Sequence, residues 1–195
     1  APAHADFDFG TGDFTLEAWV FPATISGHAA IICRQQNVGA EGLFQLRLNS
    51  GKPELVFCAK SSTSVVTLAA AQSIAANTWT HIAFARQGGT GRLFVDGVLA
   101  DTKSMAGTLN VAGRPLTIGV LDAGTGGNLV AFFSGHIDEA RITKGVARYT
   151  TNFTPPTEAF PNTGSAYALS GTVTDASNSP AARLIRAYRE DTGAL

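Results

Sequence analysis

The sequence predicts an all-β protein, a sandwich of two antiparallel sheets, and three observations lead to this prediction. Of the 195 residues, 45% are hydrophobic and only 15% are charged, so the chain has enough apolar material for a sizeable core. Glycine is frequent, with 21 residues, whereas the helix formers Lys and Glu are sparse. Short strand-like runs recur at regular spacing with turn residues between them, which favours a sandwich over βαβ units.

The strand-like runs fill most of the chain up to residue 142. Phe14 to Phe21 reads FTLEAWVF, and Leu43 to Leu48 reads LFQLRL, the second with partial alternation of apolar and polar residues. In chain order, the expected strands are 14–21, 29–33, 43–48, 55–59, 65–69, 79–85, 93–95, 98–100, 116–121, 129–133 and 137–142.

Glycine-containing turns separate several of these runs. Asp96-Gly97 lies between two apolar runs and predicts a type I′ hairpin, because that turn needs positive φ at both central residues. The stretch 87–91, QGGTG, predicts the preceding hairpin, and 49–53, NSGKP, predicts another. The one helical turn that we expect is at 143–150, TKGVARYT.

The chain is expected to divide near residue 161. Prolines at positions 155, 156 and 161 close the first domain, 1–161, with extended backbone. Residues 162–168 contain the small polar stretch NTGSA and are expected to form a linker. Residues 169–195 read as strand, turn, strand and turn. We expect them to be the first strands of a second β-domain, because an isolated two-stranded hairpin is marginal in water.

The charge balance argues against several classes of partner. The formal net charge is −1, with no basic field for nucleic acid and no polybasic run for an anionic membrane. No apolar run approaches about 20 residues, the length that spans a bilayer. The first residues, APAHADFDFG, have no basic region followed by a long apolar run, so we expect a secretory signal to be absent or already removed. An extracellular location stays open, because virion proteins reach the outside without such a signal.

The two cysteines, Cys33 and Cys58, each belong to an apolar run. We interpret them as buried free thiols. A disulfide between neighbouring strands is the alternative, and mass spectrometry with and without reductant distinguishes the two.

Three stretches of the chain carry a resemblance to a known family. They read DFDFGTGDFTLEAWVFP at 6–22, WTHIAFARQGGTGRLFVDGVLA at 79–100 and GHIDEARITKGVARYTTNFTPPTEAFP at 135–161. In order and spacing they resemble the early stretch, the central hairpin and the closing segment of laminin G-like domains in the concanavalin A-like lectin/glucanase group. The resemblance covers about four-fifths of the chain and implies a jelly-roll sandwich.

Two further resemblances concern context. The closing segment ARITKGVARYTTNFTPP is similar to versions in tailed-phage and prophage structural proteins, and 170–195 resembles the opening of a carboxypeptidase-regulatory-like or immunoglobulin-like β-domain. Family members usually open with a strand carrying a Phe-Asp-Gly turn, and here that strand is missing. It is either trimmed or supplied by a neighbouring subunit, in which case the open edge is an assembly site for strand addition.

No catalytic residues are expected, and the chain is predicted not to be an enzyme. Glycoside hydrolysis normally uses two carboxyl groups about 5–5.5 Å or 6.5–9.5 Å apart. The tight acidic strand motif that would place them is absent from the sequence. Asp138 and Glu139 are adjacent, so we expect them to point to opposite faces of a strand. Glu17 stands alone among apolar neighbours and is expected to be a buried, paired anchor.

Asp138 is the one candidate metal ligand, since the resemblance implies a structural Ca²⁺ site at this position of the closing strand. Calcium takes about six to eight oxygen ligands, and the missing opening strand would remove some of them. The alternative is that Asp138 bonds backbone groups or a nearby arginine such as Arg141.

Carbohydrate contact usually needs an exposed aromatic platform surrounded by polar groups. Trp19 and Trp79 lie in strand-like runs, so we expect them in the core. Other aromatic residues and loops are candidates for exposure, although none is specific enough to assign a ligand-binding residue: Tyr149, Phe153, Tyr167, the loop around His28 and the glycine-rich loop 123–128.

The predicted function is a non-catalytic, tail-associated module on a virion surface that helps attachment to bacterial surface polysaccharide. Other virion subunits are expected partners, with a homo-oligomer as the expected assembly. Two alternatives remain open: a purely structural virion component that acts through subunit contacts, and a glycoside hydrolase on the same sandwich.

Overall fold

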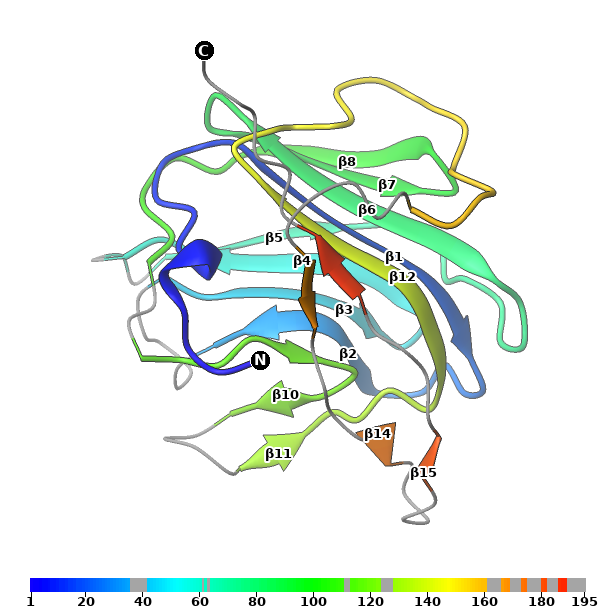
Figure 1. Cartoon of the computed structure of the whole chain (residues 1–195). Helices are drawn as coiled ribbons and strands as arrows, with labels where there is room; N and C mark the ends of the chain where they lie inside the picture. Colours follow the sequence, from blue (N-terminus) through cyan, green and yellow to red (C-terminus); the bar gives the residue numbers. More distant parts are fainter. Residues whose placement is uncertain are drawn as a thin grey trace.

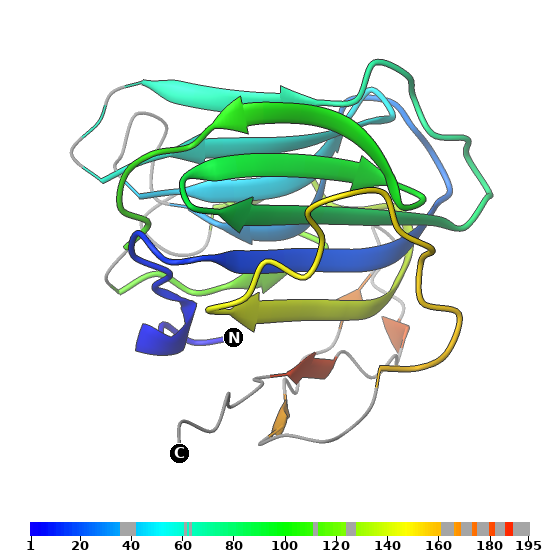
Figure 2. The ribbon, with the colours of Figure 1, turned by 90° about the horizontal axis from the view of Figure 1, so that it is seen from above.

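The chain folds as two antiparallel sheets that pack face to face (Figures 1 and 2). The computed structural model describes residues 1–35, 42–60, 62, 64–110, 113–123 and 128–160, and after them only the backbone of four short strands. The first sheet has the order β12 (Gly135–Lys144), β1 (Phe14–Pro22), β6 (Thr80–Gln87), β7 (Thr90–Val95) and β8 (Val98–Ser104). The second has the order β5 (Val65–Ala69), β4 (Lys52–Cys58), β3 (Phe44–Asn49), β2 (His28–Arg34) and β9 (Thr117–Ile118). The predicted two-sheet sandwich is confirmed.

Three smaller elements complete the described sandwich. A short 3-10 helix, η1 (Ala5–Phe7), precedes β1, and β10 (Leu121–Asp122) pairs with β11 (Leu129–Val130). Strand β12 is at the edge of the first sheet, and β1 is its ladder partner.

Alternate side chains of β1 build the core, because successive residues of a strand point to opposite faces of the sheet. Phe14, Leu16, Ala18 and Val20 are completely buried and belong to one hydrophobic cluster with residues of the second sheet. The ring of Phe14 stacks on that of Phe9 with centroids 4.2 Å apart. Burying a large apolar side chain stabilises the fold by about 1.5–3 kcal/mol, so this face of β1 fixes the strand's orientation.

The hairpin turns follow the local chemistry of the sequence. Asp96 and Gly97 have φ values of 48° and 75°, as a type I′ turn between β7 and β8 requires. Ser50 and Gly51 adopt the same region, with φ values of 49° and 77°, between β3 and β4. The stretch 87–91 joins β6 to β7 in the predicted position. All three predicted hairpins are therefore confirmed.

The strand expected at 116–121 is wrong as a single element. Gly119 has a φ of 74° and separates β9 from β10. Its N–H donates to the carbonyl of Ile31 at 3.0 Å. Because the backbone bends at this glycine, the run contributes one short strand to the second sheet and another to the β10–β11 pair.

The helical turn expected at 143–150 is also wrong. Strand β12 continues to Lys144, and irregular backbone follows it. The Thr15 hydroxyl on β1 donates to the carbonyl of Val146 at 2.9 Å and accepts from the N–H of Arg148 at 2.9 Å. These bonds hold the backbone against the sheet instead of letting it hydrogen-bond to itself. We call residues 145–160 the strap.

The strap covers the outer face of the first sheet with its own small hydrophobic layer. The rings of Tyr149 and Phe153 stack with centroids 3.6 Å apart. They pack against Phe94, Ala83 and Ala85 on β6 and β7. Figure 2 shows the strap, in yellow and orange, leaving β12 and crossing this face. Both faces of the first sheet are thus covered: the second sheet packs on the inner face, and the strap packs on the outer face.

The two cysteines are buried and not bonded to each other. Burial raises the pKa of the Cys33 thiol to about 12, and the thiolate is the reactive form. We expect a thiol reagent to label neither cysteine in the native protein at neutral pH and both after denaturation, with no mass change on reduction. Rapid native labelling of Cys33 would contradict the buried position, and a two-proton mass gain on reduction would indicate a disulfide.

The last part of the chain contributes short paired strands. Strand β13 (Ala166–Ala168) pairs with β16 (Arg186–Tyr188), and β14 (Val173–Thr174) pairs with β15 (Pro180–Ala181). Most of the predicted linker 162–168 and most of the second unit 169–195 lie outside the described residues, so this division of the chain stays a prediction. Within the described ranges, no helix is long and apolar enough to cross a membrane.

Candidate functional site

The side chains of β1 that do not enter the core point beneath the strap. Glu17 lies opposite Arg141 of β12, and Trp19 lies between Asp138 of β12 and His81 of β6. Polar and aromatic side chains from three adjacent strands therefore converge on the outer face of the first sheet. The same alternation that places the apolar residues of β1 inside places these residues outside.

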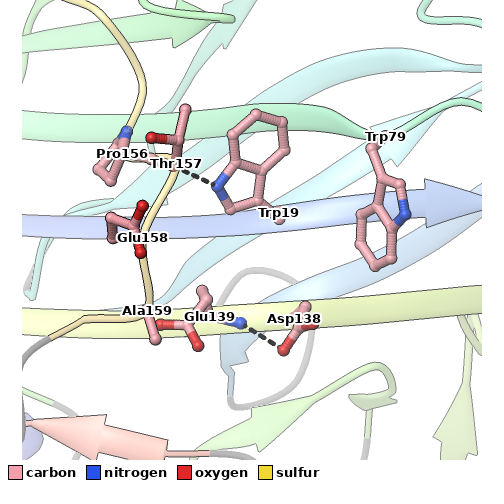
Figure 3. Close-up of a pocket in the computed structure, with 8 residues that line it drawn as sticks. All are labelled: Trp19, Trp79, Asp138, Glu139, Pro156, Thr157, Glu158 and Ala159. Carbon is pink, nitrogen blue, oxygen red and sulfur yellow. Dashed lines mark hydrogen bonds between the residues drawn. The ribbon is translucent and has the colours of Figure 1, made fainter.

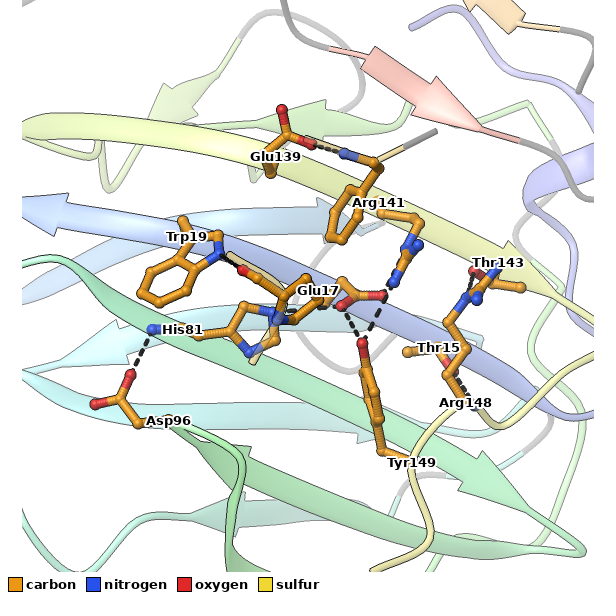
Figure 4. A network of polar contacts seen from close by, with 12 residues as sticks. Thr15, Glu17, Trp19, His81, Asp96, Glu139, Arg141, Thr143, Arg148 and Tyr149 are labelled. Atoms are coloured by element: carbon orange, nitrogen blue, oxygen red, sulfur yellow. Dashed lines mark hydrogen bonds and ion pairs between the residues drawn. The ribbon is translucent and has the colours of Figure 1, made fainter. Parts of the chain in front are cut away.

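Glu17 is completely buried and surrounded by hydrogen-bond donors (Figure 4). Its Oε1 accepts from Arg141 Nε at 2.7 Å, and its Oε2 accepts from the Tyr149 hydroxyl at 2.8 Å. Nε2 of His81 lies 3.3 Å from the same Oε2. A buried carboxylate is tolerated only when it is paired in this way. The structure confirms the expectation that Glu17 is a paired, buried anchor, and Tyr149 links it to the strap.

The surroundings of Glu17 keep it ionised. Burial by itself disfavours the charged form and raises the pKa. The adjacent His81, the hydrogen bonds from Arg141 and Tyr149, and the charge of Arg141 outweigh burial and lower the pKa of Glu17 below its ordinary value of 4.5. The pKa of Tyr149 is raised by burial and by the negative charge of Glu17. At neutral pH the pair is therefore a carboxylate and a protonated phenol that donates to it.

This lowered pKa predicts a specific acid sensitivity. Because the folded state holds the Glu17 proton more weakly than the unfolded state, its contribution to stability is present above about pH 4.5 and is lost as the pH falls through the lower, folded pKa. We expect urea unfolding between about pH 3 and pH 7 to show a steeper loss of stability for the natural protein than for Glu17→Gln, which has no proton to gain. Parallel pH profiles for the two proteins would contradict the assignment.

An extra residue in β12 changes the direction of its acidic side chains. Between the pairs Trp19–Asp138 and Glu17–Arg141, β12 contains one residue more than β1. Glu139 has a φ of 48° at this position, which identifies a β-bulge. Asp138 and Glu139 consequently line the same pocket (Figure 3). The expectation that they point to opposite faces is wrong, because simple strand alternation does not hold across a bulge.

The pocket lies between the bulge and the strap and has a volume of about 440 Å³. This is in the range of small-ligand sites. Its lining combines two indoles, three carboxylates and strap residues: Trp19, Trp79, Asp138, Glu139, Pro156, Thr157, Glu158 and Ala159. Trp79 is 38% exposed, and its ring lies 5.5 Å from that of Phe21 between centroids. The pocket therefore offers an accessible aromatic surface next to negative charge.

Three contacts hold the strap side of the pocket in place. The indole Nε1 of Trp19 donates to the carbonyl of Pro156 at 3.1 Å. Oε2 of Glu139 accepts from the N–H of Phe160 at 2.7 Å. The guanidinium of Arg141 lies over the Phe160 ring, 3.6 Å from its centroid. Because the strap is fixed at both ends of 156–160, the pocket is formed before any ligand arrives.

The structure changes the interpretation of Trp79, which the sequence placed in the core. Trp79 directly precedes the first residue of β6, and Asn77 has a φ of 56°. The turn before the strand therefore carries the indole to the rim of the sheet and leaves it exposed. An Asn two residues before an apolar run is a turn signal that identifies this position. Trp19 is half-buried and faces outward, so its expected core position is wrong as well.

The other predicted aromatic and loop candidates do not form an exposed platform within the described residues. Tyr149 and Phe153 belong to the strap and are half-buried against the outer face of the first sheet. His28 is exposed and opens β2, in the second sheet. Most of the loop 123–128 and the side chain of Tyr167 lie outside the part of the chain that the structure describes.

Asp138 lies in the pocket wall, where its Oδ1 accepts from the N–H of Glu139 at 3.0 Å. Such a backbone bond is the alternative to metal ligation that the sequence left open. Across the described ranges, no group of three or more His, Cys, Asp and Glu side chains is arranged to hold a metal ion. A structural Ca²⁺ on Asp138 stays a prediction from the resemblance.

A family model described as the concanavalin A-like lectin/glucanases superfamily, Laminin_G_3, matches residues 2–148. No match was found among curated proteins.

Solved structures with the same fold have low sequence identity. A heptameric pentraxin from Limulus polyphemus aligns with a TM-score of 0.53 and 14% identity, over 72% of this chain and 68% of its own. The CBM40 of the Ruminococcus gnavus IT-sialidase, bound to alpha2,3 sialyllactose, aligns with a TM-score of 0.55 and 12% identity, over 68% and 75%. Domain 4 of the Geobacillus stearothermophilus arabinanase AbnA, in complex with arabinotriose, aligns with a TM-score of 0.53 and 18% identity, over 68% and 60%. These similarities establish the sandwich fold.

Proposed function

The chain belongs to the concanavalin A-like lectin/glucanases superfamily, and we propose that it is a non-catalytic carbohydrate-binding module whose ligand occupies the pocket between Trp79 and the strap. The observation that carries the proposal is that the exposed indole of Trp79 lines one pocket together with the carboxylates of Asp138 and Glu158. A sugar ring presents an apolar face that packs on an aromatic ring, and hydroxyl groups that donate to carboxylates. The pocket supplies both.

Two of the structural neighbours support this choice of ligand class. The Ruminococcus gnavus module and the Geobacillus stearothermophilus domain were both solved with bound oligosaccharides. A sandwich of this shape therefore supports saccharide binding in other proteins, although a fold alone does not fix the site.

The setting that we propose is the surface of a tailed-phage virion, with bacterial surface polysaccharide as the ligand and other virion subunits, including further copies of this chain, as neighbours. The support for this setting is the similarity of the segment ARITKGVARYTTNFTPP, at 140–156, to versions found in phage structural proteins. A purely structural virion part is the second candidate. The exposed apolar side chains of Leu129, Val130 and Phe132 favour it, since such a patch fits a subunit interface.

Substituting Trp79 tests the carbohydrate proposal directly. We expect Trp79→Ala to weaken binding to a responsive bacterial polysaccharide by about tenfold or more, because the aromatic platform is lost. Phe132→Ala is the matched control: Phe132 is also an exposed aromatic residue, at 54%, but it does not line the pocket. Thermal unfolding of both variants checks that the fold is intact. Equal binding by Trp79→Ala and the natural protein would exclude this pocket as the site.

The same binding assay separates the alternatives. Binding that is lost with a chelator would support calcium at Asp138, and Asp138→Asn should then lose the calcium response. The purely structural virion component would be supported by two results together. The natural protein would bind no polysaccharide, and it would form oligomers that the Phe132→Ala variant does not form. Release of reducing sugar on long incubation would support a hydrolase.

A further inference from the structure

The lining of the pocket carries charge of one sign. Three of its residues are acidic, Asp138, Glu139 and Glu158, and none is Lys or Arg. Arg141 is on the same strand, but its guanidinium binds Glu17 at 2.7 Å and lies over the Phe160 ring. The side chains that line the pocket therefore carry a net negative charge.

The three carboxylates of the pocket differ in the hydrogen bonds that they accept from backbone N–H groups. Oδ1 of Asp138 accepts the N–H of Glu139, and Oε2 of Glu139 accepts the N–H of Phe160. Glu158 is exposed on the strap, between the two positions where the strap is hydrogen-bonded to Trp19 and Glu139. The backbone that carries Glu158 is thus fixed, and its side chain lines the same pocket as the Trp79 indole, with Trp19 between the two in Figure 3.

Resting on the proposed function, we propose that this pocket selects saccharides that carry a free, protonated amine, such as glucosamine-containing glycans, and rejects acidic ones. An ammonium group makes charge-assisted hydrogen bonds to carboxylates and is attracted to the face of an indole. A uronic or sialic acid would instead place a carboxylate beside three others, and like charges in contact oppose binding. An N-acetylated sugar keeps the shape but has no cation.

The test compares three hexasaccharides of matched length by calorimetry with the whole chain. They are oligomers of glucosamine, N-acetylglucosamine and galacturonate, titrated at low salt and about pH 6, where ordinary carboxyl groups are ionised and sugar amines are protonated. We expect the glucosamine hexamer to bind about tenfold more tightly than the N-acetylated one, and the galacturonate hexamer to show no measurable binding. Added salt should reduce the difference, because it screens exposed charges.

Variants at the pocket identify the source of the selectivity. Glu158→Gln should reduce the preference for glucosamine by about threefold, whereas Glu158→Asp, which keeps the charge, should retain most of it. His136 lies beside Trp79, with ring centroids 6.4 Å apart, and a charged imidazole there would oppose a bound amine. His136→Gln removes that contribution and should preserve or increase the preference.

The outcomes separate this inference from the function on which it rests. Equal affinities for the glucosamine and N-acetylglucosamine hexamers, binding of galacturonate, or binding of another neutral glycan without glucosamine would overturn the amine selectivity and leave a carbohydrate-binding module in place. If neither these hexamers nor the polysaccharide panel bound at all, the proposed function would be overturned, and the selectivity with it.

Discussion

Replacing Glu17 by alanine is expected to lower the free energy of unfolding by about 3–5 kcal/mol. The carboxylate is completely buried and is bonded to Arg141 and Tyr149, while His81 lies 3.3 Å away. Without it, the contacts that remain to the Arg141 charge among the described residues are those with Tyr149 and the Phe160 ring, in a site that is largely closed to water. The loss should be measured by urea unfolding at neutral pH.

A matched variant separates the charge of Glu17 from its shape. Glu17→Gln keeps the side-chain volume and an acceptor oxygen, so it should cost less than Glu17→Ala, about 1–3 kcal/mol. Tyr149→Phe removes the strap hydroxyl that donates to Glu17, and it should show a similarly moderate loss of stability. In all three variants, a change in tryptophan fluorescence would report a moved strap, because Trp19 is hydrogen-bonded to Pro156. Full stability of Glu17→Ala would mean that the network does not hold the strap.

The second large effect is expected at the turn between β7 and β8. Gly97 has a φ of 75°, and a Cβ built on it would overlap the carbonyl oxygen of Phe153. The Phe153 N–H donates to the Gly97 carbonyl at 2.9 Å, so the strap rests directly on this turn. Gly97→Ala therefore adds a steric clash to the strain of the left-handed conformation, and we expect a destabilisation of about 3–4 kcal/mol.

Gly88 provides the control for this prediction. It also has a positive φ, of 54°, but a Cβ there would meet nothing within 4 Å. Gly88→Ala should therefore cost only the backbone strain, about 1–2 kcal/mol. The difference between the two variants, read from urea unfolding, measures the contact between the strap and the turn. If both variants lost the same stability, the close approach of Phe153 to Gly97 would be contradicted.

Local sequence signals were sufficient for the framework of the fold. The Asp96-Gly97 turn needed only the preference of these residues for positive φ. The runs at 14–21 and 43–48 were recognisable as strands, but the core face of the first was not assigned, because Trp19 was expected in the core and faces outward. The position of Glu17 also followed locally, because a lone acid among apolar residues in a strand must be buried with a partner. The identity of that partner did not follow, since Arg141 lies 124 residues away along the chain.

The pocket between β12 and the strap could not be predicted in the same way. The expected opposite directions of Asp138 and Glu139 failed because a bulge arises from the register of two strands, which depends on β1 as much as on β12. The expected helical turn at 143–150 failed because the Thr15 hydroxyl binds that backbone from another strand. Neither interaction leaves a signal within the segment that it changes.

The sequence by itself determined a two-sheet sandwich, its hairpins and a chain poor in basic charge, because periodicity, turn chemistry and composition are properties of neighbouring residues. Only the tertiary structure decided that the strap would cross the outer face of the first sheet, that Trp79 would be exposed, and that Asp138, Glu139 and Glu158 would share one pocket. These features depend on contacts between segments far apart in the chain. The interactions that stabilise these features form only when the sheets and the strap pack together, so local sequence patterns do not predict them.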